Sequence, residues 1–135
     1  MTLIAYRPEY RIYLHASHNQ LTYERLEEMT LATELPHYLA DTERAISMVT
    51  PGFTVLSDLR RTLGPNFGLV PIFNSSREML RAAGIGLIVE VHPGTHGTQQ
   101  LMRQLREQSA LPTRLFTDMA QAKAFLHALR QPLPS

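Results

Sequence analysis

The segment 51–94 constrains the fold of this chain more than any other stretch. It contains an apolar run at 53–59, an amphipathic run at 69–83 and a nearly continuous aliphatic run at 85–91. Short apolar runs rich in β-branched residues predict strands, whereas apolar residues spaced by three and four predict a helix. A strand, a crossover helix and a second strand in this order form the unit from which parallel sheets are built. The segment therefore predicts an α/β fold.

Four further elements are predicted before this unit. Residues 3–6 and 11–16 are rich in β-branched and aromatic residues, and a proline-containing turn separates them. This pattern predicts an antiparallel hairpin at the start of the chain. Residues 20–34 and 37–50 predict two helices, since the Leu35-Pro36 step between them disfavours a continuous helix.

Three elements are predicted after the unit: a helix at 98–108, a strand at 113–116 and a last helix that begins at Asp118. Asp118 is followed three residues later by Gln121, which is similar to a capping box. Together these elements predict a mostly parallel sheet of four to five strands, with an N-terminal antiparallel hairpin and four to five flanking helices. A chain of 135 residues has the size of one domain, so we assign residues 1–135 to a single domain.

The composition is that of a globular protein and excludes several kinds of site. The chain is 44% hydrophobic and 19% charged and has a formal net charge of +1. It contains no cysteine, which excludes disulfides and thiolate ligands. All but one of the 13 basic residues are arginines, but they are scattered, which does not predict nucleic-acid binding. No signal peptide and no apolar run of roughly 20 residues is present, so we expect a cytoplasmic protein without an integral membrane segment.

Polar residues follow each of the three predicted parallel strands, at 53–59, 85–91 and 113–116. Ligand sites in open parallel sheets lie where the strands end, and arginine forms paired hydrogen bonds with phosphate and carboxylate groups. We therefore predict an anion site at this edge, aided by backbone amides at 95–98. Its candidate residues are Asp58, Arg60, Arg61, His92, His96 and Thr117. A second interpretation remains open, in which Asp58 pairs with a neighbouring arginine, Asp118 caps the last helix and the others are solvated.

Other chemistries have weaker support in the sequence. Asp58 follows a strand as a phosphoacceptor aspartate does, but no acidic pair follows the first strands to hold magnesium. The histidine pairs at 15 and 18 and at 92 and 96 lack a motif that brings metal ligands together. No phosphate loop and no nucleophile elbow is present. We therefore predict no catalytic residues, no metal and no cofactor.

Four segments taken together resemble the STAS-like superfamily. They are PGFTVLSDLR at 51–60, a helix ending in LRAAG at 80–84, the strand IGLIVEV at 85–91, and TDMAQAKAFLHAL at 117–129. The best-known members of this superfamily are anti-sigma-factor antagonists, and SEC14-like proteins are related to them. The resemblance implies a small α/β domain without catalysis of its own, which docks onto protein partners and in some members binds a nucleotide or an apolar ligand. The antagonists carry a phosphorylatable serine in an Asp-Ser-Ser-Gly-like loop, whereas the only Ser-Ser pair here lies inside the predicted helix 69–83.

Three hypotheses about function follow from the sequence and this resemblance. The first is a non-enzymatic regulatory or protein-interaction domain with protein partners, among which a homodimer through the edge of the hairpin is one alternative. The second is a module for a small ligand such as a nucleotide, an anion or a lipid. Its site would lie at the carboxyl edge of the sheet, or between the sheet and the helices predicted at 20–50. A small enzyme with His92 or Asp58 as acid or base is the third hypothesis.

Overall fold

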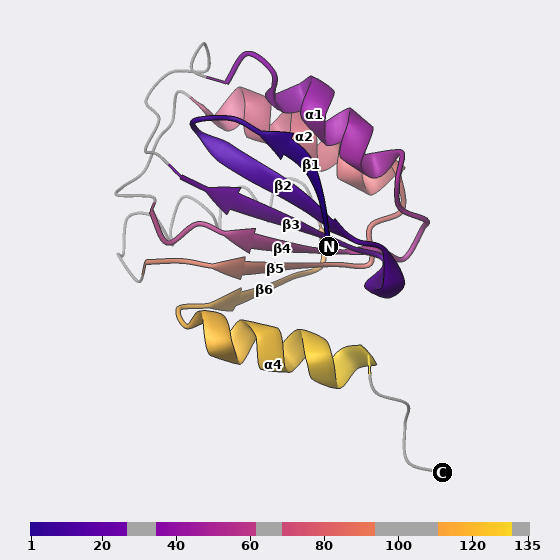
Figure 1. The fold of residues 1–135 in the computed structure, drawn as a ribbon, viewed down its shortest axis with the longest axis vertical. Coiled ribbons are helices and arrows are strands. Elements are labelled where there is room, and N and C mark those ends of the chain that lie inside the picture. The colour runs from indigo at the N-terminus through magenta and orange to yellow at the C-terminus, as the bar shows by residue number, and fades with distance from the viewer. Residues whose placement is uncertain (27–34, 62–68, 94–110, 131–135) are drawn as a thin grey trace.

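The computed structural model describes residues 1–26, 35–61, 69–93 and 111–130 (Figure 1). These residues form one six-stranded sheet whose strands lie side by side in chain order. Within the described ranges, three α-helices accompany the sheet. Two of them, α1 and α2, cover one face, and α4 lies against the other (Figure 1). The predicted α/β class is therefore confirmed.

The sheet has an antiparallel half and a parallel half. The antiparallel strands are β1 (Thr2–Tyr6), β2 (Tyr10–His15) and β3 (Gln20–Arg25). The strands that continue it in parallel are β4 (Thr54–Asp58), β5 (Leu87–Val91) and β6 (Thr113–Phe116). The helices are α1 (Tyr38–Ile46), α2 (Val70–Ala82) and α4 (Met119–Arg130), and a short 3-10 helix covers Ala16–His18. The strand-helix-strand unit predicted within 51–94 is present as β4, α2 and β5.

Two details of the predicted fold are wrong. The sheet has six strands rather than four or five, because residues 20–25 form β3 and not the start of a helix. Their side chains alternate, with Leu21, Tyr23 and Arg25 buried toward α1 and α2, and a period of two belongs to a strand. The described part of the chain also has three α-helices, fewer than the four to five predicted. The helix predicted at 98–108 lies outside the described residues.

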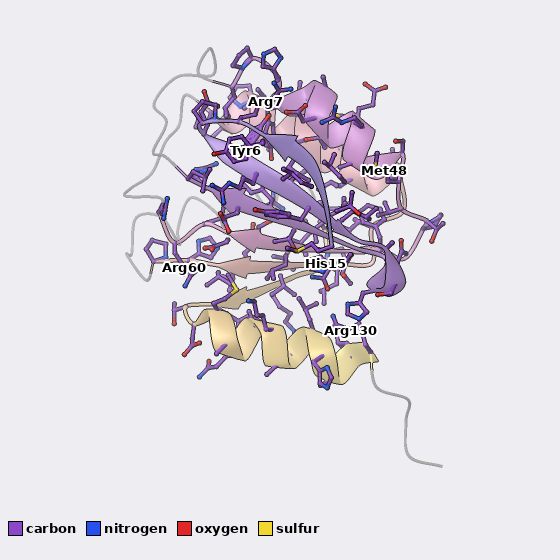
Figure 2. All side chains as sticks on the ribbon, viewed as in Figure 1. Tyr6, Arg7, His15, Met48, Arg60 and Arg130 are labelled. Carbon is purple, nitrogen blue, oxygen red and sulfur yellow. The ribbon has the colours of Figure 1, made fainter. Side chains whose placement is uncertain are left out.

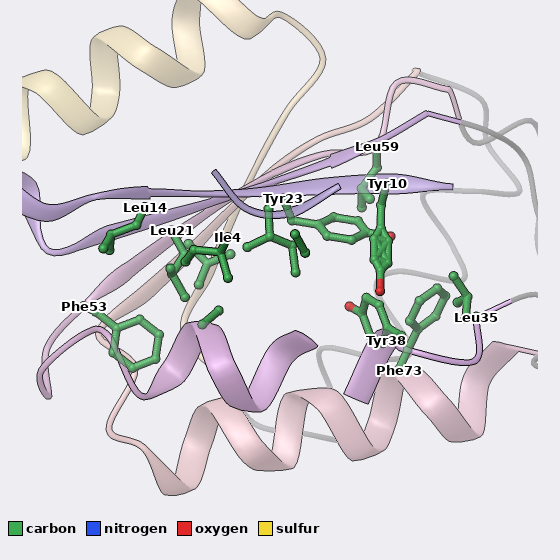
Figure 3. Close-up of a cluster of buried hydrophobic side chains, with 14 of the residues drawn as sticks. Ile4, Tyr10, Leu14, Leu21, Tyr23, Leu35, Tyr38, Phe53, Leu59 and Phe73 are labelled. Atoms are coloured by element: carbon green, nitrogen blue, oxygen red, sulfur yellow. The ribbon is translucent and has the colours of Figure 1, made fainter. Parts of the chain in front are cut away.

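The larger core lies between the sheet and the helices α1 and α2, and it ends in a cluster of aromatic rings (Figure 3). Tyr38 of α1 makes edge-to-face contacts with Tyr10, Tyr23 and Phe73, at centroid distances of 5.5, 5.7 and 5.9 Å. Such contacts fix ring orientations beyond simple burial. On the opposite face, α4 packs on a smaller core that includes Leu56. Among the described helices, none combines the length and apolarity that crossing a bilayer would require.

Candidate functional site

Three of the predicted residues, Asp58, His92 and Thr117, lie at the ends of neighbouring parallel strands. Asp58 is the last residue of β4 and is paired in register with Val91 of β5, which is paired with Phe116 of β6. His92 and Thr117 follow those two strands directly. His96 lies outside the described residues. The parallel register therefore brings three of the predicted residues to neighbouring strand ends.

Asp58 is held by a neighbouring arginine. Arg60 donates from Nε and Nη2 to its carboxylate, at 2.9 and 2.8 Å, and its backbone N–H donates at 3.2 Å. Burial raises the pKa of Asp58, but the hydrogen bonds from Arg60 and the charge of Arg61 outweigh it, so this pKa lies below its ordinary value. Arg61 donates to the backbone carbonyl of Leu26 at 3.0 Å.

These contacts correspond to the second interpretation of this edge. As that interpretation states, Asp58 is paired with a neighbouring arginine. Asp118 caps α4, because its carboxylate accepts hydrogen bonds from the backbone N–H groups of Ala120 and Gln121 at 2.7 and 3.2 Å. The guanidinium of Arg60 remains half exposed. Binding of an anion at this edge stays a prediction.

His92 departs from both interpretations because it is neither a surface ligand nor solvated. It is 1% exposed, and its Nε2 lies 3.4 Å from Oε1 of Glu90. The side chains of a strand alternate, so His92 continues the row of Glu90 on the face that α2 covers. The buried atom Nδ1 has no hydrogen-bond partner within the described ranges.

A buried polar cluster lies on this face, between the sheet and α2. Tyr23, Ser57 and Glu90 form one cross-strand row on β3, β4 and β5. Arg77 of α2 is 7% exposed, and its Nη2 donates to Oε2 of Glu90 at 2.7 Å. Charged residues are almost never buried unless they are paired, and this pair meets that condition.

A cavity of about 60 Å³ adjoins this cluster. One buried water needs roughly 10–15 Å³ of such volume, so the cavity has room for several waters or for a small polar group. Its polar lining consists of Tyr23, Arg25, Tyr38, Ser57, Ser76, Arg77 and Glu90. A second cavity of about 60 Å³ shares Tyr23, Tyr38 and Ser76 with it and is otherwise mostly apolar, with Ile12, Leu21 and Ala45 in its walls. The two cavities give the site a polar side and an apolar side.

The polar side is rich in hydrogen-bond donors. Within the described part of the chain, neither Nη1 of Arg77 nor Oη of Tyr23 has a hydrogen-bond partner, although both atoms are buried. Arg25 brings a second guanidinium, which lies over the ring of Phe73 at 5.0 Å from its centroid. Burial raises the pKa of Tyr38 to about 12, so its hydroxyl keeps its proton. Buried donors without partners are rare in native proteins, and they mark positions that a ligand, an ion or water completes.

The sequence patterns did not predict this cluster, although they contain one signal of it. Glu90 interrupts the aliphatic run 85–91, and a carboxylate inside a strand covered on both faces needs a buried partner. The partner could not be identified, because Arg77 belongs to the intervening helix. The prediction that the Ser75-Ser76 pair lies inside a helix is confirmed, and Ser76 is buried against Tyr38.

Comparisons with known proteins add nothing to this geometry, since no family model, curated protein or solved structure matches the chain. In the part of the chain that the structure describes, no three histidine or acidic side chains gather closely enough to hold a metal ion. The candidate site therefore rests on its own chemistry: a buried set of donors beside an apolar cavity.

Proposed function

We propose that this protein is a non-enzymatic regulatory domain that binds a small organic acid between the sheet and α2. The observation that carries the proposal is Arg77, a buried guanidinium on the cavity wall. Its Nη2 is bonded to Glu90, whereas its Nη1 has no partner in the described ranges. A carboxylate is the natural acceptor for such a donor, because charge-assisted hydrogen bonds are about twice as strong as neutral ones.

The surroundings of Arg77 specify the kind of acid. The hydroxyl of Tyr23, which has no partner in the part of the chain that the structure describes, supplies a second donor, so both oxygens of a carboxylate would find partners. The adjoining apolar cavity suits a short aliphatic or ring portion. Because each cavity measures only about 60 Å³, we expect a ligand of few atoms rather than a lipid or a nucleotide.

The test is a calorimetric titration of the full chain with straight-chain carboxylates from acetate to octanoate. We expect saturable binding that strengthens with chain length until the apolar cavity is full. Tyr23→Phe removes only a hydroxyl that has no hydrogen-bond partner among the described residues, so the free protein should keep its melting temperature. Its affinity should fall roughly tenfold, as expected for a lost hydrogen bond to a charged group of about 1.5 kcal/mol.

Tyr6→Phe is the matched control, because Tyr6 is exposed on β1, and it should bind as the wild type does. Arg77→Met is less informative, since the uncompensated Glu90 is expected to destabilise the fold by about 3–5 kcal/mol. Absence of binding across the series, or equal affinities for the wild type and Tyr23→Phe, would contradict the proposal.

A second candidate function is docking of a protein partner at β1. This strand is the outer member of the described sheet, and two of its large side chains, Leu3 and Tyr6, are 49% and 63% exposed. Exposed apolar side chains on an outer strand favour association with another chain. Both the partner and the membership of the STAS-like superfamily stay predictions.

A further inference from the structure

A groove lies on the opposite face of the sheet from the two cavities beneath α2. The alternation of β2 and β3 places Tyr13, His15 and Thr22 on the face that α4 only partly covers. Between these strands and the later turns of α4 lies a groove of about 470 Å³. That volume falls within the roughly 300–1,000 Å³ of pockets that hold small molecules.

The helix side of this groove is basic. Lys123, His127 and Arg130 follow one another at spacings of four and three along α4, so they share one helix face. Arg130 also reaches across to the sheet, where its Nη1 donates to Oε1 of Gln20 at 3.0 Å. Figure 2 shows His15 on the sheet side and Arg130 on the helix side.

The sheet side adds two histidines. The rings of His15 and His18 are nearly parallel, with their centroids 6.4 Å apart, and Nε2 of His15 lies 3.2 Å from Oγ1 of Thr22. The one carboxylate among the described residues that line the groove is Glu24. Burial lowers the pKa of His15, and the positive charges of the N-terminal amino group, His18, Arg130 and Lys123 lower it further. Among the described residues that line the groove, positively charged groups therefore outnumber the single carboxylate.

We infer that this groove binds the phosphate groups of a small phosphorylated ligand. Phosphate carries more than one negative charge near neutral pH and accepts hydrogen bonds from several donors at once. The groove offers an ammonium, a guanidinium, imidazoles and a hydroxyl from two directions. It differs from the cavity beneath α2 in face, in size and in the number of basic groups. Phosphate binding here is therefore independent of acid binding beneath α2.

Binding of phosphate in this groove should depend on pH. A bound phosphate favours the protonated form of His15, so affinity should rise as the pH falls from about 8 to about 6. The other charged and titratable groups that face His15 or line the groove are His18, Glu24, Lys123, His127, Arg130 and the N-terminal amino group.

The experiment is an NMR titration of the full chain with inorganic pyrophosphate, observed through the histidine ring signals. We expect saturable shifts of His15, His18 and His127, with His37 as an internal reference outside the groove. The double variant Lys123→Gln/Arg130→Gln should weaken binding about tenfold or more, as expected for the loss of two charge-assisted contacts. Arg81→Gln, an exposed change on α2, should leave the affinity unchanged.

Three results would overturn the inference: no shift of the groove histidines, equal affinity for the double variant and the wild type, or affinity that does not change between pH 8 and pH 6. Acetate serves as a probe of ligand class, because it should shift these signals much less than pyrophosphate does. Since both substituted residues lie at the surface of α4, their loss should leave the melting temperature near that of the wild type.

Discussion

The carboxylate of Asp41 is an instructive single residue, because its partners come from a distant part of the chain. It lies on α1 and is almost fully buried. Nε and Nη2 of Arg7 donate to it at 2.9 and 3.0 Å, and the hydroxyl of Tyr10 donates at 2.5 Å. Burial raises the pKa of Asp41, but these hydrogen bonds outweigh it, so the pKa lies below its ordinary value. The residue therefore ties α1 to the turn between β1 and β2.

This arrangement predicts an acid-sensitive contribution to stability. The folded-state pKa of Asp41 is below the reference value of 3.8, so its contribution is complete above about pH 4 and is lost as the pH falls through the folded pKa. Asp41→Asn should lower the free energy of unfolding at pH 7 by about 1–3 kcal/mol. At pH 3 or below the difference from the wild type should shrink, which urea unfolding at both pH values measures. Glu43→Gln, an exposed change on the same helix, should alter stability little. A difference equal at both pH values would contradict this explanation.

At the scale of elements, the turns that lead into β4 and β5 are joined by backbone hydrogen bonds that involve glycines. The N–H of Gly52 donates to the carbonyl of Gly84 at 2.7 Å, and the N–H of Gly86 donates to the carbonyl of Phe53 at 2.7 Å. Gly52 and Gly84 have φ angles of +90° and +87°, which favour glycine. A Cβ atom on Gly86 would lie 2.7 Å from the carbonyl oxygen of Gly52, closer than real contacts allow. The two turns can pack this closely only without that side chain.

We therefore expect Gly86→Ala to separate the two turns. The steric conflict is with backbone, which cannot move aside as a side chain can, so the free energy of unfolding should fall by about 1–3 kcal/mol. Urea unfolding measures the loss, and hydrogen exchange of the Gly52 and Gly86 amides should become faster. Glu43→Ala, on the exposed face of α1, is the control and should change stability by no more than about 0.5 kcal/mol. Unchanged exchange at both amides would show that the turns tolerate the methyl group.

At the scale of the whole molecule, β1 is where the described sheet stops. Leu3 and Tyr6 are exposed on this strand. Figure 2 shows Tyr6 there and Met48, which is also exposed, beyond the end of α1. A bulge between Leu3 and Ala5 interrupts the pairing with β2, and Arg44 of α1 bonds the backbone carbonyl of Ile4. Bulges, and side chains that cover the backbone of an edge strand, limit its pairing with another strand. Association at β1 would therefore use side-chain contacts rather than a continuous ladder of backbone hydrogen bonds.

If a second copy docks on β1, the mass measured by sedimentation equilibrium should rise above the monomer value of 15.3 kDa as the protein concentration increases. The variant Leu3→Lys should then stay at the monomer mass, because a charge would have to be buried in the interface. Met48→Lys is the matched control, since it adds the same charge at a similarly exposed apolar position. A monomer at every concentration would exclude the homodimer and leave only a different partner for this surface.

The fold class could be predicted from the sequence because the deciding signals are local. The spacing of apolar residues and the positions of glycines within 51–94 identify β4, α2 and β5. The short strand at 113–116 is predicted with the bounds that the structure shows. The strand β3 could not be predicted, because six residues containing Tyr23 and Arg25 carry too few apolar positions to separate a strand from a helix. β3 becomes a strand through pairing on both sides, with the preceding strand β2 and with β4, which begins almost 30 residues beyond the end of β3.

The same distinction holds for the candidate sites. The sequence by itself determined the strand-helix-strand unit within 51–94 and close pairs such as Asp58 with Arg60, whose two members are only two residues apart. The tertiary structure decided which faces pack together, and with them the buried pair of Arg77 and Glu90 and the basic groove between α4 and the sheet. The physical reason is that a buried charge is stabilised by whatever the opposite face presents to it. Which residues face a buried charge depends on the order of the strands and on the face of the sheet that each helix covers, and no local sequence pattern encodes either.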